Sequence, residues 1–195
     1  MCGIVGIYLK SKKFEKSLGG MLSKMLVSME SRGPDSAGFA IYNSDKNKIY
    51  KYSICLNEMS FEKFKKEIKN KVKIKNIEKN SDHVILKSNE KPNKILPILE
   101  DFSTISLVGY GKSIEIFKQV GNPRTVVKKF NLDSFSGTHG IGHTRMATES
   151  AITTDGSHPY STGEDECLVH NGSLSNHNNL RRKLKKSGSK FSSDN

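Results

Sequence analysis

The sequence predicts an α+β fold within one domain. The chain has 195 residues, which suffices for a single domain with a substantial hydrophobic core. Short apolar runs typical of strands are followed by amphipathic segments typical of helices, and there are no internal repeats and no long linker. Elements mixed in this way favour a layered α+β arrangement.

The N-terminal part predicts a strand, a helix and a hairpin. Residues 2–9, CGIVGIYL, form an apolar run typical of a buried strand. A β-hairpin is expected over residues 37–54, with its turn near residues 45–47. Between them a helix ends at the RGP stretch, because one helical face collects Phe14, Leu18, Met21, Leu22, Met25 and Met29.

The remaining elements follow from the same periodicities. Residues 60–79 predict a basic, partly helical segment, and residues 174–186 an amphipathic helix. A further helix is expected at 123–130, where Pro123 suits a first helical position. The other segments read as strands, namely those near 83–88, 105–110 and 114–118, the strand that leads into the loop of GTHGIGHTRMATES, and 166–172, which ends in Asn-Gly.

The charge is strongly basic, with a formal net charge of +12. Of the 32 basic residues 27 are lysine and five are arginine, whereas nucleic-acid readers rely on arginine forks as well as lysine. The excess gathers in residues 62–79 and 181–186, without a series of interleaved aromatic side chains that could stack on bases. We therefore expect no nucleic-acid partner.

Cysteine content and hydropathy indicate a soluble cytoplasmic protein. Cys2, Cys55 and Cys167 are odd in number and widely spaced, which argues against a disulfide framework or a zinc ribbon. No apolar run is long enough to cross a membrane, and the N-terminal one is too short for a signal peptide. His139 and His143 have the spacing of a zinc-binding helix, but the intervening Gly-Ile-Gly argues against a helix, so no metal is expected.

Four stretches of small and polar residues carry the functional prediction. They are CGIVG at 2–6, RGPDSAG at 32–38, GHTRMATES at 142–150 and VHNGSLSNH at 169–177. In this order they resemble class II glutamine amidotransferases, and most closely the amidotransferase subunit of N-methylglutamate synthase and related glutamate-synthase-like proteins. The resemblance covers residues 1–54 and about 105–195. It implies an N-terminal-nucleophile hydrolase fold, a four-layer αββα sandwich over residues 2–195, with a lysine-rich insertion at about 55–104.

The resemblance makes Cys2 the nucleophile. Hydrolysis of a glutamine side-chain amide needs a strong nucleophile, a proton donor for ammonia and an oxyanion site. Removal of Met1 would leave a free α-amino group beside the Cys2 thiol, and such amines exchange protons near neutrality, so no separate histidine base is required. Taken alone, Cys2 is equally consistent with a small buried residue that starts a strand.

The other site residues are assigned by the same resemblance. Asn171 and Gly172 would form the oxyanion hole, although the dipeptide alone fits an ordinary Asn-Gly turn. Arg145 would bind the α-carboxylate of glutamine, although a lone arginine more often lies in a surface ion pair. Further residues are expected in two supporting roles, substrate binding by Met146, Thr148 and Glu149, and ordering of the site by Arg32 and Asp35.

The resemblance also implies partners and an incomplete C-terminus. L-glutamine would be the substrate, and ammonia would pass to a glutamate-synthase-like subunit that carries flavin and an iron–sulfur cluster, with no cofactor in this chain. Members of the family place an ammonium-binding aspartate shortly after the helix that corresponds to 174–186. The sequence ends at Asn195, with Asp194 slightly early, so C-terminal incompleteness, low solubility and little activity are expected. The opposing interpretation is a non-catalytic subunit that binds glutamine.

Overall fold

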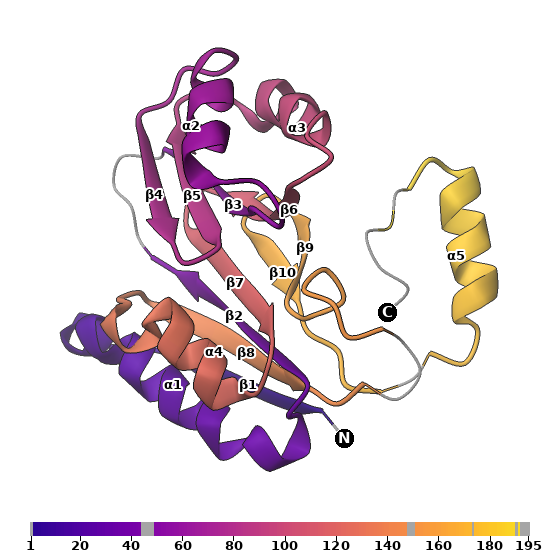
Figure 1. The fold of residues 1–195 in the computed structure, drawn as a ribbon. Coiled ribbons are helices and arrows are strands. Elements are labelled where there is room, and N and C mark those ends of the chain that lie inside the picture. Colours follow the sequence, from indigo (N-terminus) through magenta and orange to yellow (C-terminus); the bar gives the residue numbers. More distant parts are fainter. Residues whose placement is uncertain (1, 44–48, 148–150, 173, 190, 192–195) are drawn as a thin grey trace.

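The computed structural model describes residues 2–43, 49–147, 151–172, 174–189 and 191. Within them the chain forms two four-stranded antiparallel sheets, a two-stranded ribbon and five α-helices (Figure 1). Three 3₁₀ segments, Lys12–Ser17, Glu30–Arg32 and Leu132–Ser134, lie at helix ends. Across the described residues, no helix has the length and apolar character needed to cross a bilayer.

The first sheet holds the N-terminal strand in its edge position. Its order is β1-β8-β2-β7, and the strands are β1 (Gly3–Tyr8), β2 (Ser36–Tyr42), β7 (Ile114–Val120) and β8 (His139–Arg145). Helices α1 (Leu18–Ser28) and α4 (Pro123–Phe130) cover one face. Their apolar sides pack on alternate residues of β2, because successive side chains of a strand point to opposite faces.

The second sheet is built largely from the lysine-rich segment. Its order is β4-β5-β3-β6, and the strands are β3 (Tyr50–Cys55), β4 (Asn76–Asn80), β5 (His83–Ser88) and β6 (Ser106–Gly111). Helices α2 (Phe61–Lys69) and α3 (Pro92–Glu100) share a core with it. Residues 55–104 therefore supply two of the four strands and both helices of this unit.

A third cluster joins the two sheets. Ala40 on β2 and Ile116 on β7 pack with Cys55 on β3 and Val108 on β6. The faces turned away from the helices thus meet each other, and the backbone N–H of Ile116 donates to the Ser53 hydroxyl across this boundary at 3.0 Å. The result is a mixed fold of antiparallel sheets with helices outside, as the α+β prediction requires.

The C-terminal part packs less closely. Strands β9 (Tyr160–Gly163) and β10 (Glu166–Leu168) form the ribbon, which docks where Asp165 accepts a 2.7 Å hydrogen bond from the backbone N–H of Ser113. Helix α5 (His177–Lys186) follows, and none of its residues is buried. Figure 1 shows α5 standing to the side of the two sheets.

Three sequence predictions need correction. The segment 37–54 is not a hairpin, because β2 pairs with β7 and β8 while β3 pairs with β5 and β6; the turn predicted near 45–47 lies outside the described residues. Strand β10 ends at Leu168 rather than at the Asn-Gly pair. Phe14, predicted on the buried helix face, is exposed, and Leu26 takes a buried place that the predicted stripe omitted.

Candidate active site

Cys2 lies at the start of β1, beside the end of β8. Gly3 pairs with Thr144 in the antiparallel register. The next residues outward, Cys2 and Arg145, therefore lie at the same end of the sheet. There the backbone N–H of Met146 donates to the Cys2 sulfur at 3.4 Å, and the thiol lies 3.8 Å from the Met146 carbonyl oxygen. The half-buried thiol is therefore held by the chain that leaves β8.

The RGPDS loop locks onto the same backbone. A side chain at Gly33 would place its Cβ 2.4 Å from the carbonyl carbon of Thr144, so only glycine allows this approach. The Asp35 N–H donates to the Arg145 carbonyl at 3.1 Å, and the Asp35 carboxylate accepts from the Ala147 N–H at 2.8 Å. Asp35 thus bonds to the residues on both sides of Met146.

Two side chains from other parts of the chain converge on Cys2. Arg32 Nε donates to the Cys2 carbonyl oxygen at 3.3 Å, and Asn171 Nδ2 donates to the same oxygen at 2.9 Å. Gly172 follows with φ +153°, a conformation that favours glycine. The structure therefore brings four separated segments together around one cysteine, and the catalytic roles of these residues remain predictions.

The predicted substrate-binding residues differ in burial, and two of them lie outside the described residues. Arg145 is buried, at 3% exposure, and its Nη1 donates to the Ala151 carbonyl at 3.1 Å. Met146 is 45% exposed, and its backbone N–H and carbonyl oxygen contact the Cys2 sulfur. Thr148 and Glu149 lie outside the described residues.

A buried histidine pair behind this site was not identified from the sequence. His143 Nε2 bonds to the His170 carbonyl at 2.9 Å, directly before Asn171, and the His143 ring lies 4.1 Å from that of His158. Desolvation by burial lowers the pKa of His143 to about 4 and that of His158 to about 3, so both are neutral at neutral pH. A neutral His143 donating from Nε2 fixes the chain that presents Asn171.

Lys118 secures the loop that carries His158. Its ammonium donates to the carbonyls of Asp155 at 3.1 Å and Ser157 at 2.9 Å, and it lies 4.8 Å from the centre of the Tyr160 ring. Burial lowers the pKa of Lys118 to about 8. In the sequence, Lys118 is one of many lysines and lies in a strand, and no motif indicates that it holds the loop of residues 155–157.

The chemistry open to this arrangement centres on one thiol and several N–H donors. A cysteine sulfur that accepts a backbone N–H can carry negative charge, and an amide side chain beside it can stabilise charge that develops on a substrate oxygen. Because these groups come from four elements, the arrangement is set by the tertiary fold rather than by local sequence.

Comparisons with known proteins identify the family. No family model matches the chain. The glutamine amidotransferase-like protein GlxB of Rhizobium meliloti (strain 1021) is 45% identical over 199 residues, which covers 100% of this chain and 66% of GlxB. A putative glutamine amidotransferase of Methanothermobacter thermautotrophicus is 30% identical over 210 residues, covering 100% of this chain and 68% of that protein. The chain belongs to the glutamine amidotransferase family.

A shorter match reaches a second group of this family. The glutamine–fructose-6-phosphate aminotransferase of Methanococcus maripaludis is 36% identical over 115 residues, which is 54% of this chain and 19% of that enzyme. The alignment with GlxB, by contrast, extends over the whole amidotransferase chain, the lysine-rich segment included. This chain spans about two thirds of the length of the first two relatives, 66% and 68%.

Proposed function

We propose that this glutamine amidotransferase hydrolyses the side-chain amide of L-glutamine, with Cys2 as the nucleophile. The observation that carries the proposal is the convergence of the Met146 N–H, Arg32 and Asn171 on Cys2. These donors come from the motifs on which the family resemblance rests. Removal of Met1 would free the α-amino group of Cys2, which then takes the thiol proton and later delivers it to ammonia.

The proposed reaction has two steps, formation of a thioester and its hydrolysis. The Cys2 sulfur attacks the amide carbon, and the tetrahedral intermediate collapses to a thioester while ammonia leaves with the proton held by the α-amino group. Water then attacks the thioester, which releases glutamate and restores the thiol. Asn171 and Gly172 would hold the oxyanion. One N–H of the Asn171 amide already binds the Cys2 carbonyl, and an amide side chain has a second N–H for the substrate oxygen.

Arg145 is proposed to bind the glutamine α-carboxylate. A guanidinium has five N–H donors in a planar fork suited to a carboxylate, and Arg145 lies directly before Met146, whose backbone N–H contacts the Cys2 sulfur. Met146, Thr148 and Glu149 are proposed to complete the substrate pocket. Arg32 and Asp35 would keep Cys2 and the chain after β8 in place through the hydrogen bonds described above.

The fold and the ammonia acceptor are part of the same proposal. Helices outside two sheets that face each other support an N-terminal-nucleophile αββα sandwich as one domain over residues 2–195. The acceptor is proposed to be a glutamate-synthase-like subunit in the cytoplasm, of the N-methylglutamate synthase type, and the flavin and iron–sulfur cluster would belong to it.

Replacement of Cys2 tests this function. Cys2→Ala should abolish release of glutamate and ammonia while glutamine binding, measured by calorimetry, persists. Cys167→Ser is the matched control, because Cys167 is a cysteine of similar exposure that bonds to Tyr42 instead. Retained turnover in Cys2→Ala would exclude Cys2 as nucleophile. Glutamine binding without turnover by the unaltered chain and its partner would support the non-catalytic subunit instead.

A further inference from the structure

A second group of reactive side chains lies on the second sheet. Cys55 is the last residue of β3 and His83 the first of β5, and the two are directly opposite each other in the antiparallel register. Cross-strand partners project from the same face of a sheet. The Cys55 sulfur, a ring nitrogen of His83 and a carboxylate oxygen of Asp82 lie within 4.8 Å of one another. The sheet register therefore builds this cluster without any sequence motif.

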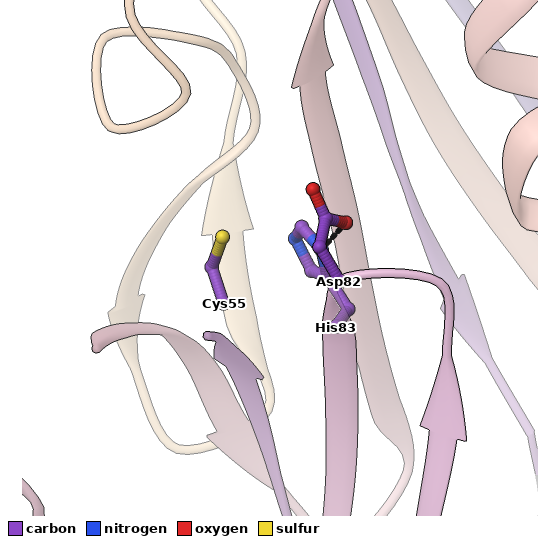
Figure 2. A group of neighbouring side chains, drawn as sticks. All are labelled: Cys55, Asp82 and His83. Carbon is purple, nitrogen blue, oxygen red and sulfur yellow. Dashed lines mark hydrogen bonds and ion pairs between the residues drawn. The ribbon is translucent and has the colours of Figure 1, made fainter. Parts of the chain in front are cut away.

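One nitrogen of this cluster has no hydrogen-bond partner among the described residues. The His83 side chain is fully buried, and its Nδ1 bonds to Asp82 Oδ1 at 2.9 Å. His83 Nε2 is buried and makes no hydrogen bond with any residue that the structure describes. Figure 2 shows the imidazole between the Asp82 carboxylate and the Cys55 thiol, with one ring nitrogen turned to each side. A buried ring nitrogen without a bond is unfavourable unless a ligand occupies it.

We propose that Cys55 and His83 bind a thiophilic metal ion of the Zn²⁺ or Cu⁺ class. Thiolate and imidazole are the donors that such ions prefer, with metal–sulfur and metal–nitrogen bonds of about 2.3 and 2.0 Å. Two donors of one ion are therefore at most about 4.3 Å apart, close to the 4.8 Å within which the atoms of this cluster lie. Asp82 accepts the Nδ1–H and holds Nε2 toward the ion, which is the usual way a carboxylate orients a metal-binding histidine.

The Cys55 thiolate would offset part of the charge of the added cation. Binding displaces the Cys55 thiol proton to solvent, so the thiolate offsets one positive charge of the ion. Lys129 already pairs with Asp82 Oδ2 at 2.7 Å, and Lys118 bonds to the Asp155 and Ser157 carbonyls. Lys129 belongs to α4, and the ring of its neighbour Phe130 lies edge-on to His83 at 4.9 Å. The ion would therefore stabilise the junction of the two sheets. This site is separate from the candidate active site at Cys2.

The test removes the other two cysteines and leaves Cys55, His83 and Asp82 unchanged. In Cys2→Ala/Cys167→Ser, Cys55 is the only cysteine of the three that remains. This protein is refolded with Zn²⁺, Cu⁺ or the spectroscopic probe Co²⁺, because the donors are buried. We expect one bound Zn²⁺ or Cu⁺ per chain after dialysis, a sulfur-to-cobalt charge-transfer band, and a melting temperature that rises with metal.

Replacement of the donors completes the test. Cys55→Ser and His83→Gln in that background should weaken metal affinity at least tenfold and remove the rise in melting temperature, and Asp82→Asn should weaken it by about 10- to 100-fold. Absence of the charge-transfer band, or equal affinity in Cys55→Ser, would overturn the proposal. Because the band is recorded with the site intact, a variant that fails to fold does not decide the outcome.

Discussion

The two halves of the candidate active site differ in how firmly the fold holds them. Cys2 directly precedes β1 and Arg145 ends β8, in the first sheet, where β1 pairs with β8 and helix α1 covers the strands. Asn171 and Gly172 lie in an exposed stretch between β10 and α5, and α5 buries none of its residues. Among the described residues, this stretch is tied to the first half by hydrogen bonds from His143 to the His170 carbonyl and from Asn171 to the Cys2 carbonyl.

This difference separates global stability from the geometry of the oxyanion site. Segments with few buried apolar contacts open with a smaller free energy than the core does. Cys2, the proposed nucleophile, should therefore stay in place under conditions in which Asn171 is already displaced. Substitutions in the half that belongs to the first sheet should then lower the free energy of unfolding. Substitutions around Asn171 should lower kcat instead.

The largest expected contrast is in stability. Leu22 on α1 is 0% exposed and Leu180 on α5 is 45% exposed. Leu22→Ala leaves a cavity in the first core and should lower the free energy of unfolding by about 2 to 5 kcal/mol. Leu180→Ala should change it by less than about 0.5 kcal/mol, because little apolar surface is removed from contact. Urea unfolding followed by circular dichroism measures both, and equal losses would show that α5 packs as firmly as α1.

The sequence predicted most elements of the fold but not how they pair. Helix α4 was placed at its observed bounds because Pro123 and the apolar spacing mark it locally. A hairpin was predicted at 37–54 because the two strands follow each other in the sequence. In the structure nearly every residue of β2 and β3 is buried, and the two strands belong to different sheets. Both are inner strands of their sheets, so each has a partner on both edges, and most of those partners come from distant segments.

The site shows the same division. Motifs brought Cys2, Arg32, Asp35 and Asn171 to attention, and the structure places hydrogen bonds among their segments. His143 lies within one of these motifs, yet its bond to the His170 carbonyl depends on the return of the chain after β10. Cys55 and His83 share no spacing signature, since only strand register brings them together.

The second prediction concerns the weakly packed half of the site. Asn171→Ala should lower kcat by about 10² to 10³, equivalent to about 2.7 to 4 kcal/mol, with little change in KM, because an oxyanion donor acts in the transition state. Asn179→Ala is the control, since Asn179 is an exposed amide on α5 whose side chain bonds to Arg182. Steady-state glutaminase kinetics decide the matter, and an effect confined to KM would reassign Asn171 to substrate binding.

The smallest expected effect is a pH dependence that belongs to the well-packed half. The buried pair His143 and His158 has pKa values lowered to about 4 and about 3, while an unfolded histidine titrates near 6.5. Between these values the unfolded chain binds protons that the folded chain does not, so stability falls as pH decreases from 6.5 toward 4. The cationic groups that oppose protonation are Lys118 and Arg145, with His170 beside them.

Each histidine should contribute at most about 1.4 kcal/mol per pH unit in that window. His158→Gln removes one titrating group at similar size, so its free energy of unfolding should depend less steeply on pH than that of the unaltered chain. The comparison between the two proteins cancels carboxyl groups such as Asp82, whose pKa is lowered to about 2 chiefly by its bonds to His83 and Lys129, against the opposing effect of burial. Urea titrations at pH 6.5, 5.5 and 4.5 measure the difference. Parallel curves would mean that His158 is as accessible to protons in the folded chain as in the unfolded one, and the tightly packed half of the site would then open as readily as the segment that carries Asn171.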